Sequence, residues 1–167
     1  MYSMAGQLAR IALLVALGLQ LPGQVVAATT PEAGQKVVFV CEHGSVKSLI
    51  AASYFNRSAQ AHGLPYHAIA RGTAPEPRVP LSVQKGLHAI EVDVSSYVPQ
   101  LFQASDVEGA SLVVSFDQDI DGLVGGKVQH LKWDRLPAVL TNYPRGRDAI
   151  VAQIDSLIAL LAQGRSP

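Results

Sequence analysis

The 167-residue sequence has one cysteine, Cys41, no excess of either charge, and no apolar run long enough to cross a membrane. A single cysteine excludes an internal disulfide. The 13 basic and 13 acidic side chains give no basic surface of the kind that binds nucleic acid, so we expect no nucleic-acid partner. The apolar run IALLVALGLQL (11–21) is shorter than the roughly 18 residues that a membrane-spanning helix needs.

Residues 1–28 have the pattern of a secretory signal peptide. Arg10 precedes the apolar run, and the segment ends in two alanines that suit signal peptidase. We therefore expect a signal peptide over 1–28, a polar leader over 29–35 and one domain over 36–167, in a periplasmic or secreted protein with no membrane anchor after cleavage. The alternative is an uncleaved anchor. An unpaired cysteine in such an oxidising compartment requires an explanation.

Apolar runs alternate with helix-periodic segments throughout the domain. The runs predict strands at 36–40, 66–72, 111–116 and 127–133. The periodicity predicts helices at 46–62, 82–90, 98–107 and 147–162. The segment EVDVSSY (91–97) is part of this alternation and is not assigned to a strand or a helix. Residues 117–126 are expected to form a loop. This order predicts an α/β fold of three layers, with a four-stranded, mainly parallel sheet and helices on both faces.

The stretch CEHGSVKS (41–48) joins the first predicted strand to the first predicted helix. Ligands of such sheets bind beyond the carboxyl ends of the strands, where Cys41 lies. Backbone N–H groups in the loop can point inward, and the start of the helix adds a partial positive charge, so an oxyanion can bind there. The same field favours the thiolate form of a cysteine. The alternative is that Cys41 is a small buried hydrophobic residue.

The segment VVFVCEHGSVKS (37–48) is similar to the nucleophile loop of the low-molecular-weight protein tyrosine phosphatase and arsenate reductase family, which places C-x5-R-[ST] directly after its first strand. The likeness extends weakly over 36–163. It implies that Cys41 is the nucleophile and that the Ser48 hydroxyl steadies the thiolate. It also implies an oxyanion-binding loop made of Glu42, His43, Gly44, Ser45, Val46 and Lys47. The implied partner is a phosphate-like oxyanion or a phosphomonoester, with no cofactor and no metal.

Three departures from the family pattern weaken the implied chemistry. The family's arginine is replaced by Lys47, so a planar fork that grips two oxygens becomes a point charge. Glu42 places a carboxylate beside the nucleophile, where it either is solvated or pairs with Lys47. The family's Asp-Pro general acid is replaced by Leu-Pro at 136–137, and the nearest carboxylate is Asp134, which either acts as the acid or caps a turn. A second acidic cluster, at Asp117, Asp119 and Asp121, is expected to be solvated.

The expected function is hydrolysis of phosphomonoesters, of the protein tyrosine phosphatase type, through a cysteinyl-phosphate intermediate and with weakened activity. Two alternatives remain: a non-catalytic oxyanion-binding protein, and an arsenate reductase that depends on a small external thiol. The thioredoxin-coupled reductase mechanism of the family needs two further cysteines, and the sequence has none.

Overall fold

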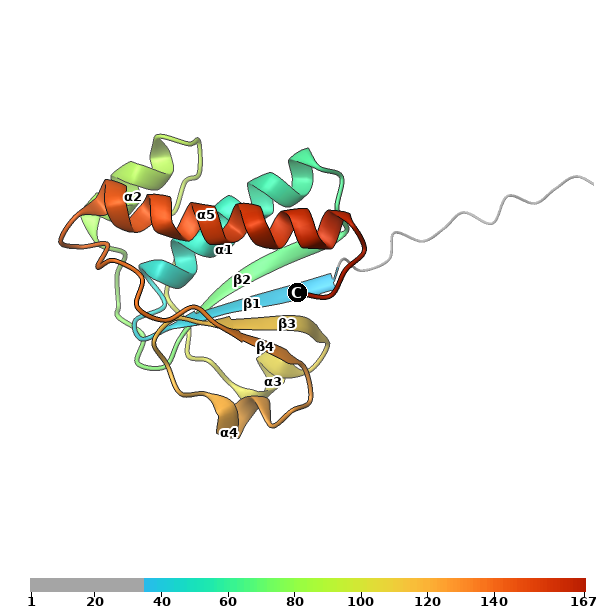
Figure 1. Ribbon diagram of the computed structural model, residues 1–167. Coiled ribbons are helices and arrows are strands. Elements are labelled where there is room, and N and C mark those ends of the chain that lie inside the picture. Colours follow the sequence, from blue (N-terminus) through green and yellow to red (C-terminus); the bar gives the residue numbers. More distant parts are fainter. Residues whose placement is uncertain (1–34) are drawn as a thin grey trace, which may run out of the picture. The chain divides into compact units, whose positions relative to one another are not determined.

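The computed structural model describes residues 35–167, so the predicted signal peptide and all but the last residue of the predicted leader lie outside the described residues. The elements are shown in Figure 1. In chain order they are β1 (Gln35–Cys41), α1 (Lys47–Ala61), β2 (Tyr66–Gly72), α2 (Leu81–His88), α3 (Ala104–Val107), β3 (Ala110–Ser115), α4 (Asp121–Val124), β4 (Gln129–Lys132) and α5 (Tyr143–Ala162).

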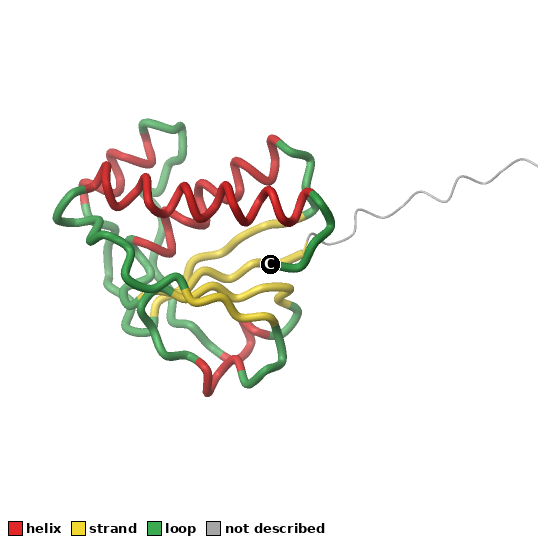
Figure 2. Tube along the Cα trace, viewed as in Figure 1, coloured by secondary structure: helices red, strands yellow, loops and turns green. Residues whose placement is uncertain are grey.

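The four strands form one sheet in the order β2-β1-β3-β4, and every neighbouring pair is parallel (Figure 2). The predicted four-stranded α/β fold is confirmed. Cys41 is the last residue of β1, at the carboxyl edge of the sheet, and pairs with Gly72 of β2. Because β1 has a strand on each side, the backbone of Cys41 is held by the interior of the sheet.

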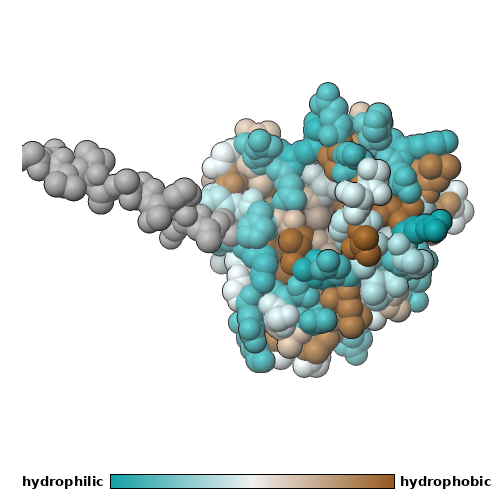
Figure 3. Space-filling view, turned by 180° about the vertical axis from the view of Figure 1, so that it is seen from behind, coloured by the Kyte–Doolittle hydropathy of each residue, from teal (hydrophilic) through white to brown (hydrophobic). Residues whose placement is uncertain are grey.

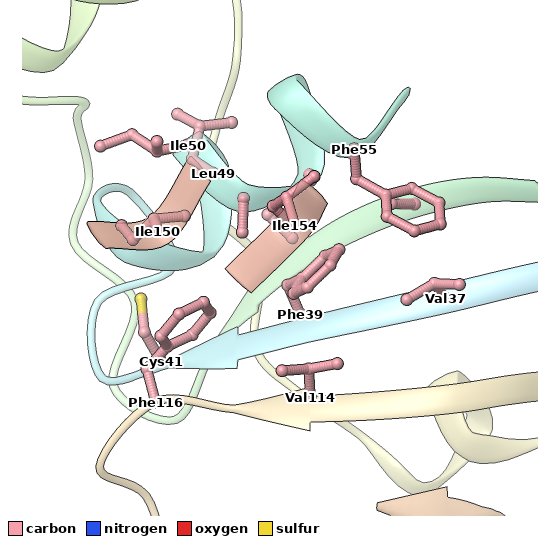
Figure 4. Packing of buried hydrophobic residues seen from close by; sticks show 14 of the residues in the cluster. Val37, Phe39, Cys41, Leu49, Ile50, Phe55, Val114, Phe116, Ile150 and Ile154 are labelled. Atoms are coloured by element: carbon pink, nitrogen blue, oxygen red, sulfur yellow. The ribbon is translucent and has the colours of Figure 1, made fainter. Parts of the chain in front are cut away.

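Helices cover both faces of the sheet, as Figure 1 shows. Side chains of successive β1 residues point to opposite faces. Val37 and Phe39 therefore pack in the larger core under α1 and α5, and Val38 and Val40 pack in the smaller core with residues of α3 and α4. Figure 4 shows the larger core at close range, with the Cys41 sulfur on the same side of the sheet as the ring of Phe39.

The last helix begins at Tyr143, earlier than the predicted start at 147. The side chain of Asn142 caps it by accepting a hydrogen bond from the backbone N–H of Arg145 at 3.1 Å. Pro144 follows in the first turn, where the missing N–H is not needed. Asparagine followed shortly by proline is a helix start that the apolar pattern alone does not reveal.

The helix expected over 98–107 is reduced to α3, and 91–97 forms neither a helix nor a strand. The helical pattern is overridden because the backbone of 100–102 pairs with the end of β2. The Gly72 N–H donates to the Gln100 carbonyl, and the Phe102 N–H donates to the Gly72 carbonyl. The loop expected over 117–126 contains the short helix α4.

On the face shown in Figure 3, hydrophobic residues form separate areas between hydrophilic ones. No helix within residues 35–167 is long and apolar enough to span a membrane.

Candidate active site

Cys41 and Ser48 meet where β1 ends and α1 begins. The Cys41 Sγ lies 3.1 Å from the Ser48 Oγ, and Cys41 is only 5% exposed. Ser48 is fully buried in the first turn of α1, whose N-cap residue is Val46. The hydroxyl of Ser48 is therefore turned toward the sulfur rather than used as the N-cap of the helix. A hydroxyl at this distance can donate to a thiolate and stabilise it.

The residues between the two, 42–47, are called here the Cys41 loop. A segment after β2, residues 73–76, runs along its outer side and is called here the strap. The carbonyl of Cys41 accepts a hydrogen bond from the Thr73 N–H at 3.0 Å, and the carbonyl of Glu42 accepts one from the Ala74 N–H at 2.7 Å. The carbonyl of His43 accepts a third from the strap, from the N–H of residue 76 at 3.2 Å.

Tyr97 continues this row of donors. Its hydroxyl lies 3.1 Å from the carbonyl oxygen of Gly44 and 3.2 Å from that of Ala70. Burial raises the pKa of the Tyr97 phenol, against a smaller opposing effect of the Arg71 charge, so the hydroxyl keeps the proton that it donates. Tyr97 thus ties the tip of the Cys41 loop to β2.

The carbonyls of four consecutive residues, 41–44, therefore accept hydrogen bonds on one side of the loop. In a trans peptide the N–H points opposite to the C=O, and none of the described peptide bonds is cis. The N–H groups of residues 42–45 consequently point away from the strap, toward the concave side of the loop. Such a row of convergent amides is an anion-binding arrangement.

The Cys41 loop lies very close to the end of β2. Gly44 has a φ of 68°, a conformation that glycine adopts without strain. A Cβ on Gly44 would lie 2.9 Å from the backbone nitrogen of Gly72, and a Cβ on Gly72 would lie 2.7 Å from that of Gly44. Both positions therefore require glycine for the two backbones to approach this closely.

Lys47 forms an ion pair with Asp117, not with Glu42. The Lys47 Nζ donates to the Asp117 Oδ2 at 2.6 Å, and the lysine side chain is 19% exposed. Partial burial opposes ionisation of Asp117, but the hydrogen bonds from Lys47 and from the Arg135 N–H, with the lysine charge, hold the pKa of that carboxyl below its usual range. The only cation of the Cys41 loop other than a protonated histidine is therefore already neutralised.

A cavity of about 270 Å³ opens over Cys41. One wall carries Cys41, Glu42, His43, Val46 and Lys47, and the other carries Phe116, Asp117, Gln118, Leu136, Ala138, Val139 and Leu140. The cavity thus combines a thiol, one ion pair and a largely apolar wall.

The remaining predicted site residues lie around this cavity. The His43 Nε2 lies 3.7 Å from a carboxylate oxygen of Glu42 and from one of Glu76, at the rim. Ser45 is fully buried and donates to Glu76 at 3.2 Å, so its hydroxyl faces the strap side. Asp134 is exposed and does not line the cavity; its Oδ1 accepts the backbone N–H of Asp117 at 3.0 Å.

The acidic cluster divides between two places. Asp117 lies in the cavity, whereas Asp121 binds His130 at 3.1 Å and Lys132 at 2.6 Å on β4. No group of three potential metal-ligating side chains converges within residues 35–167. Sequence reasoning missed Asp117 and Tyr97 as site residues. For Asp117 a signal existed, because it directly follows an apolar strand at the same sheet edge as Cys41.

A family model described as low molecular weight phosphotyrosine protein phosphatase matches residues 36–136. Among curated proteins, none matches the chain.

Several solved structures share the fold. A YwlE mutant from Bacillus subtilis is 18% identical, with a TM-score of 0.68, and the match covers 77% of this chain and 99% of that one. A low molecular weight protein tyrosine phosphatase from T. tengcongensis is 19% identical, with a TM-score of 0.64 and coverage of 75% and 98%. An arsenate reductase in the phosphate binding state is 18% identical, with a TM-score of 0.62 and coverage of 75% and 97%.

Proposed function

The chain belongs to the low molecular weight phosphotyrosine protein phosphatase family, and on that premise we propose that it binds a phosphate-like oxyanion or phosphomonoester in the Cys41 loop and hydrolyses phosphomonoesters slowly through a cysteinyl-phosphate. The observation that carries the proposal is the orientation of the loop. Four carbonyls accept hydrogen bonds on its outer side, so the amides of residues 42–45 point away from that side, and the cavity into which the Cys41 sulfur opens is lined by Glu42, His43, Val46 and Lys47 of the same loop. These amides can bind the equatorial oxygens of a phosphoryl group.

The reaction proceeds in two displacements. The Cys41 thiolate attacks phosphorus, a sulfur–phosphorus bond forms, and the phosphorus–oxygen bond to the leaving group breaks. Water then attacks the cysteinyl-phosphate, releasing inorganic phosphate and returning the electron pair to sulfur. Ser48, at 3.1 Å, donates a hydrogen bond to the sulfur when it carries negative charge.

Two features support weak activity. Lys47 is held by Asp117 at 2.6 Å, so its charge is not free to follow the phosphoryl oxygens in the transition state. Neither aspartate near the cavity is suited to protonate the leaving oxygen: Asp134 lies outside the cavity, and the lowered pKa of Asp117 keeps that carboxyl ionised at neutral pH. Loss of general acid catalysis typically reduces the rate by about 10²–10⁴-fold.

The same ion pair favours a second candidate, a non-catalytic protein that keeps the anion-binding loop and no longer turns over. The small-thiol-dependent arsenate reductase is a third candidate, supported by the structural likeness to an arsenate reductase. It would require an external thiol to resolve a Cys41–arsenic adduct, because the chain has no second cysteine.

Hydrolysis of an activated aryl phosphate separates these candidates, because its leaving group departs without a general acid. We expect slow turnover that Cys41→Ser abolishes, together with a phosphoryl adduct on the wild-type chain detected by mass spectrometry after rapid acid quench. Saturable phosphate binding without turnover or adduct would favour the binding protein. Arsenate reduction that depends on added glutathione would favour the reductase. Turnover that persists in Cys41→Ser would contradict the proposal.

We also propose export to the periplasm or the outside of the cell. The support is the composition of residues 1–28, which resembles a cleavable signal peptide. Amino-terminal sequencing of the protein from its native cells should begin near Ala28 or Thr29. A protein in the cytoplasm that retains Met1 would contradict export.

A further inference from the structure

The carboxylate of Asp117 faces the same cavity as the proposed anion site, which is an unexpected place for a negative charge. Its Oδ2 accepts from Lys47 at 2.6 Å and its Oδ1 accepts from the Arg135 N–H at 2.7 Å. A carboxylate has about four lone-pair positions, so about two remain after these bonds. The Asp117 side chain is 42% exposed, so the remaining positions are accessible from the cavity.

The position of this carboxylate is fixed by its backbone. Asp117 has a φ of 52°, and its N–H donates to the Asp134 Oδ1 at 3.0 Å. Bonds to α1, to residue 135 and to residue 134 therefore hold Asp117 from three directions. A bound anion must accommodate the carboxylate, because turning the side chain away would break the bonds to Lys47 and Arg135.

A tetrahedral oxyanion in this cavity meets donors on one side and an acceptor on the other. The inward amides of residues 42–45 bind any oxyanion, since every oxyanion offers acceptor oxygens. The Asp117 carboxylate is favourable only to an oxygen that carries a proton and can donate it. An oxygen without a proton would meet a like charge, which opposes binding.

We infer that Asp117 makes the site selective for oxyanions that retain a proton, such as monohydrogen phosphate and arsenate, over oxyanions that do not, such as sulfate. This inference rests on the proposed oxyanion site. For a phosphomonoester, the same contact selects the monoanion, which has one P–OH group. The neighbouring charges also disfavour an oxyanion that has no proton. Lys47 is neutralised by Asp117, and Glu42 adds a further carboxylate to the cavity wall.

The direct test is isothermal titration calorimetry of the chain with sodium phosphate and with sodium sulfate at mildly alkaline pH. Both anions are then dianions and differ in the proton that phosphate keeps. We expect phosphate to bind at least about tenfold more tightly than sulfate, because sulfate leaves the charged acceptor without a donor, and hydrogen bonds to charged groups contribute about 1.5–3 kcal/mol, where about 1.4 kcal/mol is tenfold in affinity. Arsenate and selenate form a second pair with the same difference, and arsenate should be preferred.

Asp117→Asn assigns the selectivity to this side chain. Asparagine tolerates a positive φ. Its amide oxygen can still accept from Lys47, while its NH₂ group replaces the oxygen that accepted the Arg135 N–H and can donate to sulfate. We expect the ratio of phosphate to sulfate affinity to fall to within about threefold, mainly through a gain in sulfate affinity. Asp119→Asn is the matched control: it removes the same charge from an exposed residue outside the cavity, so the ratio should not change. Asp117→Ser, which also removes the charge, is a second variant.

The possible outcomes are distinguishable. Equal wild-type affinity for phosphate and sulfate would overturn the inference and leave the oxyanion site standing. Undiminished selectivity in both Asp117 variants would overturn the role of Asp117. If the wild-type chain binds none of the four anions, the proposed function fails and the inference fails with it.

Discussion

Replacing Gly44 with alanine measures how much the close approach between the Cys41 loop and β2 contributes to stability. Alanine at Gly44 would have two costs. The φ of 68° strains a residue with a Cβ, and the added Cβ would clash with the backbone nitrogen of Gly72 at 2.9 Å. Alanine substitutions at two other glycines measure the backbone strain and the clash separately. Gly63 has a φ of 63° with no atom within 4 Å of an added Cβ, whereas Gly72 has no positive φ but would place a Cβ 2.7 Å from the Gly44 nitrogen.

The expected magnitudes follow from the geometry. Alanine in the left-handed region costs about 1–2 kcal/mol, so Gly63→Ala should lower the free energy of unfolding by that amount. Forcing backbone atoms apart costs about 1–3 kcal/mol, which is the expected effect of Gly72→Ala. Gly44→Ala should combine the two, for a loss of about 2–5 kcal/mol. Because Gly44 and Gly72 share one contact, the double variant should lose less than the sum of the single losses.

Urea unfolding followed by circular dichroism gives all four free energies under one condition. The same variants should be titrated with phosphate, because displacement of the Cys41 loop should weaken anion binding in Gly44→Ala and Gly72→Ala and not in Gly63→Ala. A Gly44→Ala variant no less stable than Gly63→Ala would refute the close-approach argument. Additive losses in the double variant would refute the shared contact.

Three further predictions concern the residues around the loop. Lys47→Arg should not raise kcat/KM for an aryl phosphate, because the guanidinium will pair with Asp117; a clear rise would show that the loop still accepts the family's arginine. Tyr97→Phe should lower the free energy of unfolding by about 1–3 kcal/mol, because the one O–H that the carbonyls of Gly44 and Ala70 share is lost, and should weaken phosphate binding; unchanged urea unfolding would contradict this. Since the folded pKa of Asp117 is lowered, its contribution to stability is present above its unfolded pKa and is lost as the pH falls through the folded value. Asp117→Asn should therefore lose less stability than the wild type on acidification, as measured by urea unfolding at a series of pH values, and an equal loss would contradict the assignment.

The fold could be predicted because its determinants are local. The run KVVFV is buried on both sides, and the spacing of Val46, Leu49 and Ile50 gives the first helix one apolar face. The start of the segment 98–107 was predicted incorrectly because Val98, Leu101 and Phe102 fit a helical spacing, while the backbone of 100–102 pairs with Gly72, which is distant in sequence. Such tertiary pairing overrides local periodicity and leaves no local signal.

The site could be predicted only as far as the contiguous loop. Cys41 and Ser48 are seven residues apart in one motif, so their proximity follows from the strand-loop-helix connection. The partner of Lys47 is 70 residues away, whereas the sequence offered only the nearby Glu42 as an ion-pair partner. The order of the strands brings Asp117 to Lys47, because β3 lies beside β1 and its first following residues reach the Cys41 edge.

The strap and the residue after it have the sequence TAPEP (73–77). The donors of the strap are Thr73, Ala74 and Glu76, and prolines occupy 75 and 77, where no N–H is required. A proline restricts the chain before folding, so less conformational entropy is lost when the strap becomes ordered. The two prolines thus stiffen the segment without removing any of its three hydrogen bonds to the loop. A proline at 73, 74 or 76 would remove one. The shape of the anion-binding loop is therefore encoded partly in a segment that contributes no side chain to the cavity.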